Sequence, residues 1–169
     1  MLCQLANHDV RGYRESVSTA LEYFSHTVSS KARFSLLHCC TLVASAPKES
    51  DRLIKLAEEQ VRSQRNTKTL NLLGIANYHA GNHEKAMQTF HAALKAEGKA
   101  GKVTAFLFLA RILHQQQKWD ESQKWMKKVE AWAARMTPQN WRHKVRWQIW
   151  LSEARRELAI FPPMPKAKR

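Results

Sequence analysis

Apolar residues recur every three or four positions along most of this chain, which is the pattern of amphipathic α-helices. The pattern is clearest in the middle of the sequence. There, Leu70, Leu73 and Ala76 share one helical face, and Ala86 and Phe90 share the face of a second helix. A Gly-Asn dipeptide separates the two segments and indicates a turn. This stretch is therefore predicted to be a helical hairpin.

Small residues occupy the positions where the two helices of this hairpin would approach most closely. Gly74 and Ala86 leave room that the ring of Phe90 is expected to fill, because a protein core is close-packed. The pattern returns further along the chain: Ala110 follows Gly74 by 36 residues, and Ser122 follows Ala86 by 36 residues. A constant offset of this kind predicts structural repeats.

The central hairpin combines small and aromatic side chains at fixed distances: Gly74, Tyr78, Gly81, Ala86, Phe90 and Ala93-Leu94. This set resembles the tetratricopeptide repeat, a helical hairpin of about 34 residues. One position departs from the pattern. Where the repeat usually has a tyrosine in its first helix, this chain has Asn77, and Tyr78 follows it. The resemblance implies an all-α, right-handed stack of antiparallel helical hairpins, with about nine helices.

The periodicity also suggests where the elements begin and end. The clearest repeats are expected at 67–98 and 102–136. A last helix is predicted at 138–159, where it would cap the open face of the final hairpin. Together these elements predict a single helical domain over 1–160, and the basic tail 161–169 is expected to be disordered.

Before residue 66 the pattern is weaker and predicts about one and a half degenerate hairpins. Ser29-Ser30 are candidate N-terminal caps of a helix. Pro47 is expected to end that helix, because the residue before a proline leaves the helical conformation. Ser50-Asp51 are then expected to begin the next helix.

Further motifs are spread over most of residues 9–160: Gly12-Tyr13-Arg14, the stretch from Thr27 to Cys40 closing at Ala46-Pro47, Asp51-Arg52-Leu53, Leu56-Ala57-Glu58, Leu107-Phe108-Leu109-Ala110, Trp125, Trp141, Arg155-Arg156-Glu157 and Leu158. They resemble the C-terminal helical-repeat tail of very large planctomycete proteins, many of which carry a serine/threonine kinase domain, WD repeats or both. The chain has no Gly-rich loop, His-Arg-Asp or Asp-Phe-Gly motif, so no kinase activity carries over. We expect either a stand-alone repeat protein or the tail of a larger one.

Charge is the unusual global property of this chain. The net charge is +14, and residues 101–169 contribute +10 of it, from 15 basic and 5 acidic side chains. Such a bias favours acidic partners, nucleic acid among them. The sequence has no apolar run of about 18 residues and no secretory signal, so we expect a cytoplasmic protein with no membrane partner.

No enzymatic chemistry, cofactor or metal site is predicted. His79 and His83 are four residues apart, but the Gly81-Asn82 turn between them breaks the helix that a metal pair would need. Three cysteines, of which Cys39 and Cys40 are adjacent, suit reduced structural thiols better than a disulfide framework or a nucleophile.

The resemblance places a concave binding face on the first helix of each hairpin. Its candidate residues are Asn71, Ile75, Tyr78, His79, Leu107, Arg111, His114 and Gln115. In the known groove that clamps C-terminal carboxylates, a Lys and an Asn stand where this chain has Asn71 and Ile75, so that ligand is not supported. The function expected is a scaffold or regulatory module that binds a peptide or a partner protein.

Two alternatives stay open. All six tryptophans lie between residues 119 and 150, interleaved with cations. Trp141, Arg142 and Arg146 could therefore stack bases and hold phosphates of a nucleic acid. Helical spacing favours core packing for the tryptophans of the last helices. The array could also pack against another domain of its own polypeptide.

Overall fold

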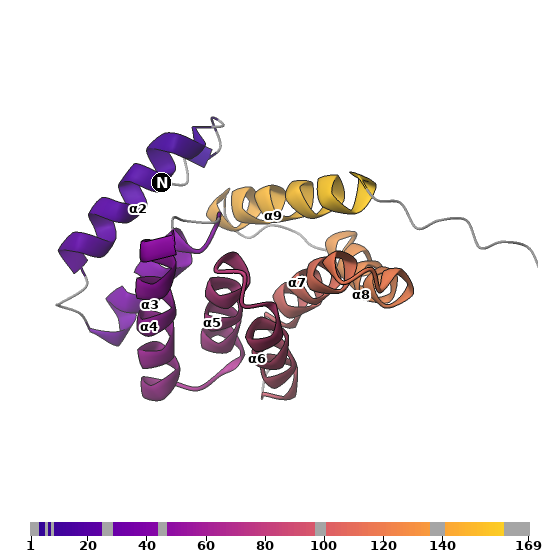
Figure 1. The fold of residues 1–169 in the computed structure, drawn as a ribbon, viewed down its shortest axis with the longest axis horizontal. Helices are drawn as coiled ribbons and strands as arrows, with labels where there is room; N and C mark the ends of the chain where they lie inside the picture. Colours follow the sequence, from indigo (N-terminus) through magenta and orange to yellow (C-terminus); the bar gives the residue numbers. More distant parts are fainter. Residues whose placement is uncertain are drawn as a thin grey trace, which may run out of the picture.

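The computed structural model describes residues 4–5, 7, 9–24, 29–43, 47–96, 101–135 and 141–160, except for the side chains of residues 47, 141–144 and 160. Eight helices lie within these residues, and they pack against their neighbours in sequence. They are α2 (Val10–Phe24), α3 (Ser30–Cys40), α4 (Pro47–Ser63), α5 (Thr67–His79), α6 (His83–Lys95), α7 (Lys102–Gln115), α8 (Trp119–Ala133) and α9 (Trp141–Ile160). Figure 1 shows α3 to α8 following one another across the molecule, with α9 along one side of them.

The predicted all-α class and the packing of helices against their neighbours in sequence are thus confirmed, and local sequence explains where the helices begin. Ser29 caps α3 by accepting a hydrogen bond from the Ala32 backbone amide. At the start of α5, the side chain of Asn66 accepts from the backbone of Thr69 at 3.1 Å, and the Thr69 hydroxyl accepts from the backbone amide of Asn66. This capping box satisfies amides that have no partner inside the helix. Gly81, with φ of +80°, then makes the turn into α6.

The α5–α6 pair is closed by one contact between a glycine and a ring. Phe90 is fully buried, and a Cβ added to Gly74 would lie only 2.6 Å from Cε1 of that ring. The core predicted at these two positions is confirmed. In α7 and α8 the equivalent pair is Ala110 and Met126, which are also buried. In this second pair, Ala110 is slightly larger than Gly74, and the side chain of Met126 is slimmer than that of Phe90.

The first three described helices meet around a buried phenol. The Tyr13 hydroxyl on α2 donates to the Cys39 carbonyl oxygen at 2.8 Å and accepts from the Leu42 backbone amide at 3.2 Å. These two bonds tie α2 to the end of α3. The next helix, α4, begins at Pro47, three residues before the predicted start at Ser50. Proline is well suited to the first helical position, because it needs no hydrogen bond there.

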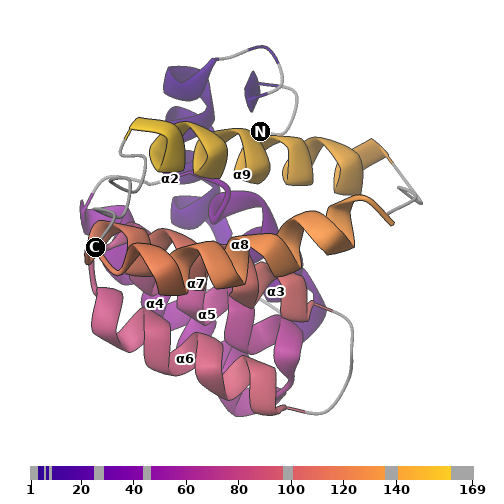
Figure 2. The same ribbon diagram turned by 90° about the vertical axis from the view of Figure 1, so that its right-hand side faces the viewer.

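The last helix, α9, lies across α3, α5 and α7, which are the first helices of the successive helix pairs. It packs against α7, and the Trp150 indole N–H donates to the carbonyl oxygen of Leu42, at the end of α3, at 3.3 Å. Trp147, Trp150 and Ala154 of this helix are buried, whereas Leu151 and Leu158 are partly exposed. Figure 2 shows α9 lying beside α8; its N-terminal half contacts the end of α3, and its C-terminal half contacts Arg111 of α7. This position extends further along the stack than a cap of the final hairpin would.

Two predictions concern parts of the chain outside the described residues: the start of the last helix at residue 138 and the disorder of the basic tail 161–169. Right-handedness of the stack also stays a prediction. Among the described helices, none has the length and apolar character needed to cross a bilayer.

The contact between Gly74 and Phe90 can be tested by the sign of the stability change that Gly74→Ala causes. In an exposed helix, replacing glycine by alanine stabilises by about 1 kcal/mol. Here Gly74→Ala should instead destabilise by about 1–3 kcal/mol, because the new methyl group overlaps the ring. Phe90→Ala should cost about 3–5 kcal/mol through the cavity it leaves. Free energies of unfolding from urea denaturation give both values.

The double variant is the control. In the Phe90→Ala background the methyl group has space, so Gly74→Ala should become neutral or stabilising. If Gly74→Ala costs the same in both backgrounds, the two residues do not compete for one volume.

Candidate functional site

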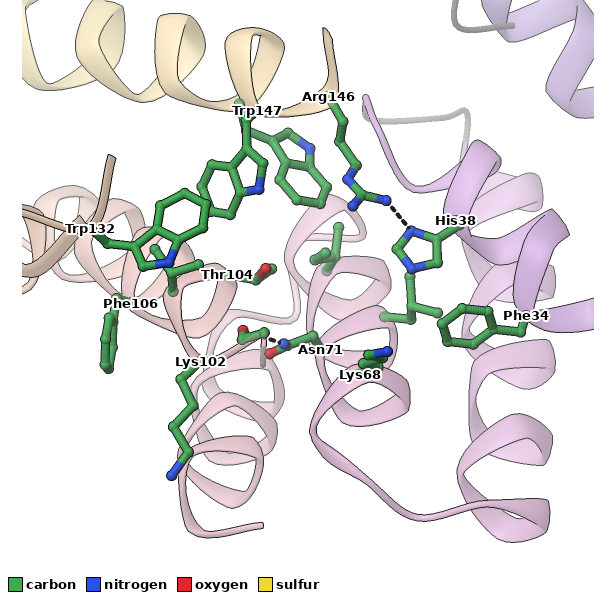
Figure 3. Close-up of a pocket in the computed structure, with 15 residues that line it drawn as sticks. Phe34, His38, Lys68, Asn71, Lys102, Thr104, Phe106, Trp132, Arg146 and Trp147 are labelled. Atoms are coloured by element: carbon green, nitrogen blue, oxygen red, sulfur yellow. Dashed lines mark hydrogen bonds between the residues drawn. The ribbon is translucent and has the colours of Figure 1, made fainter. Parts of the chain in front are cut away.

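A cavity of about 590 Å³ opens between α3, α5, α7 and α9, and we call it the central cavity. Its lining comes from the first helices of the pairs α3–α4, α5–α6 and α7–α8, from α9 and from the end of α8. The lining residues are Phe34, His38, Lys68, Asn71, Leu72, Ile75, Gly101, Lys102, Val103, Thr104, Phe106, Trp132, Arg146, Trp147 and Trp150. In Figure 3, Arg146 and Trp147 project from α9 toward the side chains of α3 and α5.

The lining of the central cavity is aromatic and positively charged. Five of its fifteen residues are Phe or Trp, and three are Lys or Arg. None of these lining residues, all within the described part of the chain, is Asp or Glu. Apolar walls with a few charged groups are typical of ligand sites, and this volume falls within the usual range of about 300–1,000 Å³. The cavity is suited to a ligand that combines negative charge with apolar surface.

Arg146 is the cation that lies deepest in this lining. Its Nη1 donates to Nδ1 of His38 at 2.6 Å, and its guanidinium lies 5.5 Å from the ring centre of Trp150. The Nε atom is buried and has no hydrogen-bond partner. Burial lowers the pKa of Arg146, because removal from water disfavours the charged form. Among the ion pairs of the described residues, none includes Arg146.

Asn71 joins α5 to the start of α7. It is 4% exposed, and its Nδ2 donates to the Gly101 carbonyl oxygen at 2.7 Å (Figure 3). Its Oδ1 atom is buried without a partner. Gly101, with φ of +92°, begins α7 with no side chain as a cap. One wall of the central cavity therefore carries an unused hydrogen-bond acceptor.

A second cavity, of about 320 Å³, lies at the C-terminal halves of α5 and α7, and we call it the Arg111 cavity. Arg111 is 4% exposed and pairs with Glu157 of α9 through two hydrogen bonds, of 2.8 Å from Nε and 2.6 Å from Nη2. Glu153, one turn earlier, lies 3.4 Å from the same guanidinium. The ring of Tyr78 packs against it at 4.9 Å. These contacts hold α9 on α7.

The pKa shifts in the Arg111 cavity agree with this pairing. Burial alone would lower the pKa of Arg111, but the hydrogen bonds and charge of Glu157 outweigh it, and the pKa is raised. Burial raises the pKa of Glu153, although Arg111 opposes that shift. His79 has its Nε2 atom buried, and burial together with the charge of Arg111 lowers its pKa to about 3. His79 is therefore neutral at physiological pH.

The eight residues predicted to form one concave face are divided by α9. Asn71 and Ile75 line the central cavity, Tyr78, His79, Arg111 and Gln115 line the Arg111 cavity, His114 lines a third cavity of about 450 Å³, and Leu107 is fully buried. Six of the eight are at most 7% exposed. Arg111 in particular binds carboxylates of its own chain, so it is not free to bind a partner.

Of the three residues predicted for nucleic-acid binding, Arg146 alone has a described side chain, so the prediction of a common surface stays a prediction. Arg146 lies in the lining of the central cavity, whereas the side chains of Trp141 and Arg142 are outside the described residues. A different aromatic-cation cluster lies on α7 and α8: the Phe106 and Trp125 rings stack at 5.3 Å, and Lys128 Nζ lies 4.0 Å from the Trp125 ring centre.

His79 and His83, considered as metal ligands, and the adjacent cysteines, considered as nucleophiles, take part in packing. His79 and His83 both pack against the ring of Tyr78, at 5.4 and 5.5 Å. Cys40 is fully buried, and burial raises the pKa of its thiol to about 12. Since the thiolate is the nucleophilic form of cysteine, Cys40 is unreactive at neutral pH.

Sequence reasoning did not single out Lys68, Lys102 or His38 as site residues. Lys68 and Lys102 begin two consecutive first helices, so a search for cations at equivalent helix starts could have found them. The contact between His38 and Arg146 joins residues 108 positions apart, and no local sequence pattern predicts it.

Comparison with known proteins identifies no family. No protein-family model matches this chain, and neither do the curated proteins or the solved structures. Any proposal for its function therefore depends on the cavities and charges of the chain itself.

The Arg111–Glu157 pair should be a major source of stability. Glu157→Gln leaves a buried guanidinium without its main counter-charge, which should cost about 3 kcal/mol in urea denaturation. The matched control is Glu15→Gln, in the pair that Glu15 forms with Arg11 at 3.0 Å, where the side chains are 67% and 92% exposed. That change should cost less than about 0.5 kcal/mol. Equal costs would show that Arg111 does not fasten α9.

His79 should make stability depend on pH. The unfolded chain binds a proton at His79 near pH 6.5, whereas the folded chain does so only near its pKa of about 3. Stability is therefore complete above pH 6.5 and falls as the pH decreases, by roughly 2 kcal/mol from this residue at pH 5. His79→Gln should flatten the slope of unfolding free energy between pH 6.5 and 5, and the exposed His91→Gln should not. An unchanged slope in His79→Gln would contradict the assignment.

Proposed function

We propose that this chain is a tetratricopeptide-like interaction module, without catalysis of its own, that binds an extended acidic segment of a partner protein in the central cavity. The observation that carries the proposal is the composition of that cavity: aromatic walls, three cations and no carboxylate among its lining residues. Charge complementarity of this kind selects acidic partners and repels basic ones.

Three features support the repeat assignment. The helices α6 and α8 begin 36 residues apart, at His83 and Trp119, which matches the sequence offset. The contact of Phe90 with Gly74 is the pairing that the resemblance implies, and the residues 36 positions later, Ala110 and Met126, are both buried. First helices of successive pairs line the cavity, as expected where such stacks bind a ligand.

The dimensions of the central cavity fit an extended peptide better than a helix. A helix with its side chains is about 10–12 Å across, and α9 already occupies the space beside α7 that such a helix would need. An extended strand could instead enter between α3 and α7 and place alternate side chains in the cavity. Lys68 and Lys102, at the starts of α5 and α7, would then face its acidic side chains.

Nucleic-acid binding is the second candidate. The stacked rings of Phe106 and Trp125 with Lys128 beside them form a small platform of the kind that holds single-stranded bases. Lys124 and Lys127 are exposed on the same helix and add positive charge. In this candidate the net charge of +14 acts through phosphates, and binding depends steeply on salt.

A fluorescence anisotropy titration separates these candidates. The probes are a labelled eight-residue peptide of Asp, Glu and Phe, the same peptide with Lys in place of the acids, and a single-stranded oligonucleotide. We expect saturable binding of the acidic peptide at about 150 mM salt, where exposed charges are largely screened. The Lys-containing peptide should not bind.

The control variants carry equal charge changes. Lys68→Glu with Lys102→Glu should weaken binding of the acidic peptide at least about tenfold, through charge repulsion at the cavity. Lys85→Glu with Lys95→Glu, on the exposed face of α6, should leave it within about twofold. If both pairs weaken binding equally, the peptide senses only net charge. If the oligonucleotide alone binds at this salt concentration, the second candidate replaces the first.

A further inference from the structure

We propose that Arg146 forms an anion subsite inside the central cavity, and that it recognises an acidic side chain directly beside an aromatic one in the bound peptide. This inference rests on the proposed function and makes it more specific. An acidic side chain of the ligand enters the cavity, and Arg146 binds its negative charge.

The first argument is that Arg146 has an incomplete set of partners. His38 accepts one of its hydrogen bonds at 2.6 Å, and the ring of Trp150 lies against its guanidinium at 5.5 Å. Both partners are uncharged when His38 accepts through Nδ1, so neither neutralises the cation. Its Nε–H is buried with no acceptor. A half-buried cation in this state is costly, and an incoming anion would remove that cost.

The second argument is that the chain's own carboxylates are occupied or distant from this cavity. Glu153 and Glu157, the two acids on the same helix, are both engaged with Arg111. No carboxylate is among the lining residues that the structure describes. Of the 14 acidic residues, Glu97 alone lies outside the described residues. The segment 161–169 contains no Asp or Glu.

The third argument concerns the rest of the ligand. The indole rings of Trp147 and Trp150 lie 5.8 Å apart at nearly a right angle, and Trp132 lies 4.7 Å from Trp147. Trp147 and Trp150 are only 2% exposed, so the partly exposed ring of Trp132 is the one of the three that can offer edge or stacking contacts to an aromatic side chain of the ligand. The unpartnered Oδ1 of Asn71, a residue only 4% exposed, is an acceptor for a peptide N–H. Anion, ring and backbone amide occur together in an acidic residue followed by an aromatic one.

The test uses the full chain and the fluorescence of its cavity-lining tryptophans. The probes are acetylated and amidated hexapeptides with the sequence Ser-Gly-Asp-Phe-Gly-Ser, and the same peptide with Asn or with phosphoserine in place of Asp. The Asp peptide should bind about tenfold more tightly than the Asn peptide, which is the size of a charge-assisted hydrogen bond to a buried partner. The phosphoserine peptide shows whether the subsite prefers a phosphoryl group to a carboxylate.

Variants assign that preference to one residue. Arg146→Met should bring the Asp and Asn peptides to equal affinity and change the Asn peptide by less than about twofold. Arg155→Met, an exposed arginine on the same helix, loses the same charge and should keep the tenfold preference. Arg146→Lys keeps the charge and should keep part of the preference. It also serves if Arg146→Met unfolds, which a thermal melt would show.

Other outcomes overturn the inference in separable ways. If both peptides bind wild-type protein equally, the cavity binds peptides but Arg146 does not read charge. If neither peptide binds, and the acidic eight-residue peptide also fails, the proposed function falls as well. If Glu97→Gln tightens binding of the Asp peptide about fivefold or more, the chain's own Glu97 is the anion that Arg146 holds, and the subsite is not a ligand site.

Discussion

The arrangement of this protein depends on the ring of Phe108, which is fully buried where four helices meet. It lies 5.2 Å from the ring of Tyr78 on α5, 5.5 Å from Phe90 on α6 and 5.5 Å from Trp150 on α9. Each of these contacts adds apolar burial and a favourable ring geometry. Helices α5, α6, α7 and α9 therefore share one core, and α9 cannot leave without exposing that core.

The fixed position of α9 produces two sites that differ in how the charge of an arginine is compensated. On one side Arg111 donates two hydrogen bonds to Glu157 and lies beside a second carboxylate, that of Glu153, so its charge is compensated within the chain. On the other side Arg146 donates to the imidazole of His38, lies against the ring of Trp150 and is near the thiol of Cys39, with no carboxylate in a described ion pair. The first arrangement contributes to stability, since removal of either partner leaves a buried charge. The second leaves the buried Nε–H of Arg146 without an acceptor, which is the basis of the proposed anion subsite.

Sequence patterns could predict the elements of this fold, because helices follow from local periodicity. The small residue at Gly74 and the ring of Phe90 were recognisable as a packing pair. The start of α4 was wrong by three residues, since Pro47 was interpreted as a helix end although it also suits a first helical position. Residues on the first helices were interpreted as an open face, and the pairing of Arg111 with a carboxylate 46 residues later was not predictable. Long-range contacts leave no periodic trace, so the cavities could be found only in three dimensions.

The uneven charge of the chain acquires a different meaning once burial is considered. Many of the cations that make up the +14 are exposed side chains, such as Lys85, Lys95 and Lys124, whose fields are screened within about 10 Å at moderate salt. Those cations can speed the approach of any acidic molecule, but they cannot distinguish one from another. Discrimination requires a charge in surroundings of low dielectric constant, where an unmatched group is penalised. Arg146 stands in such surroundings, between an imidazole and an indole, so the selectivity of this protein should depend on that one half-buried charge far more than on the many exposed ones.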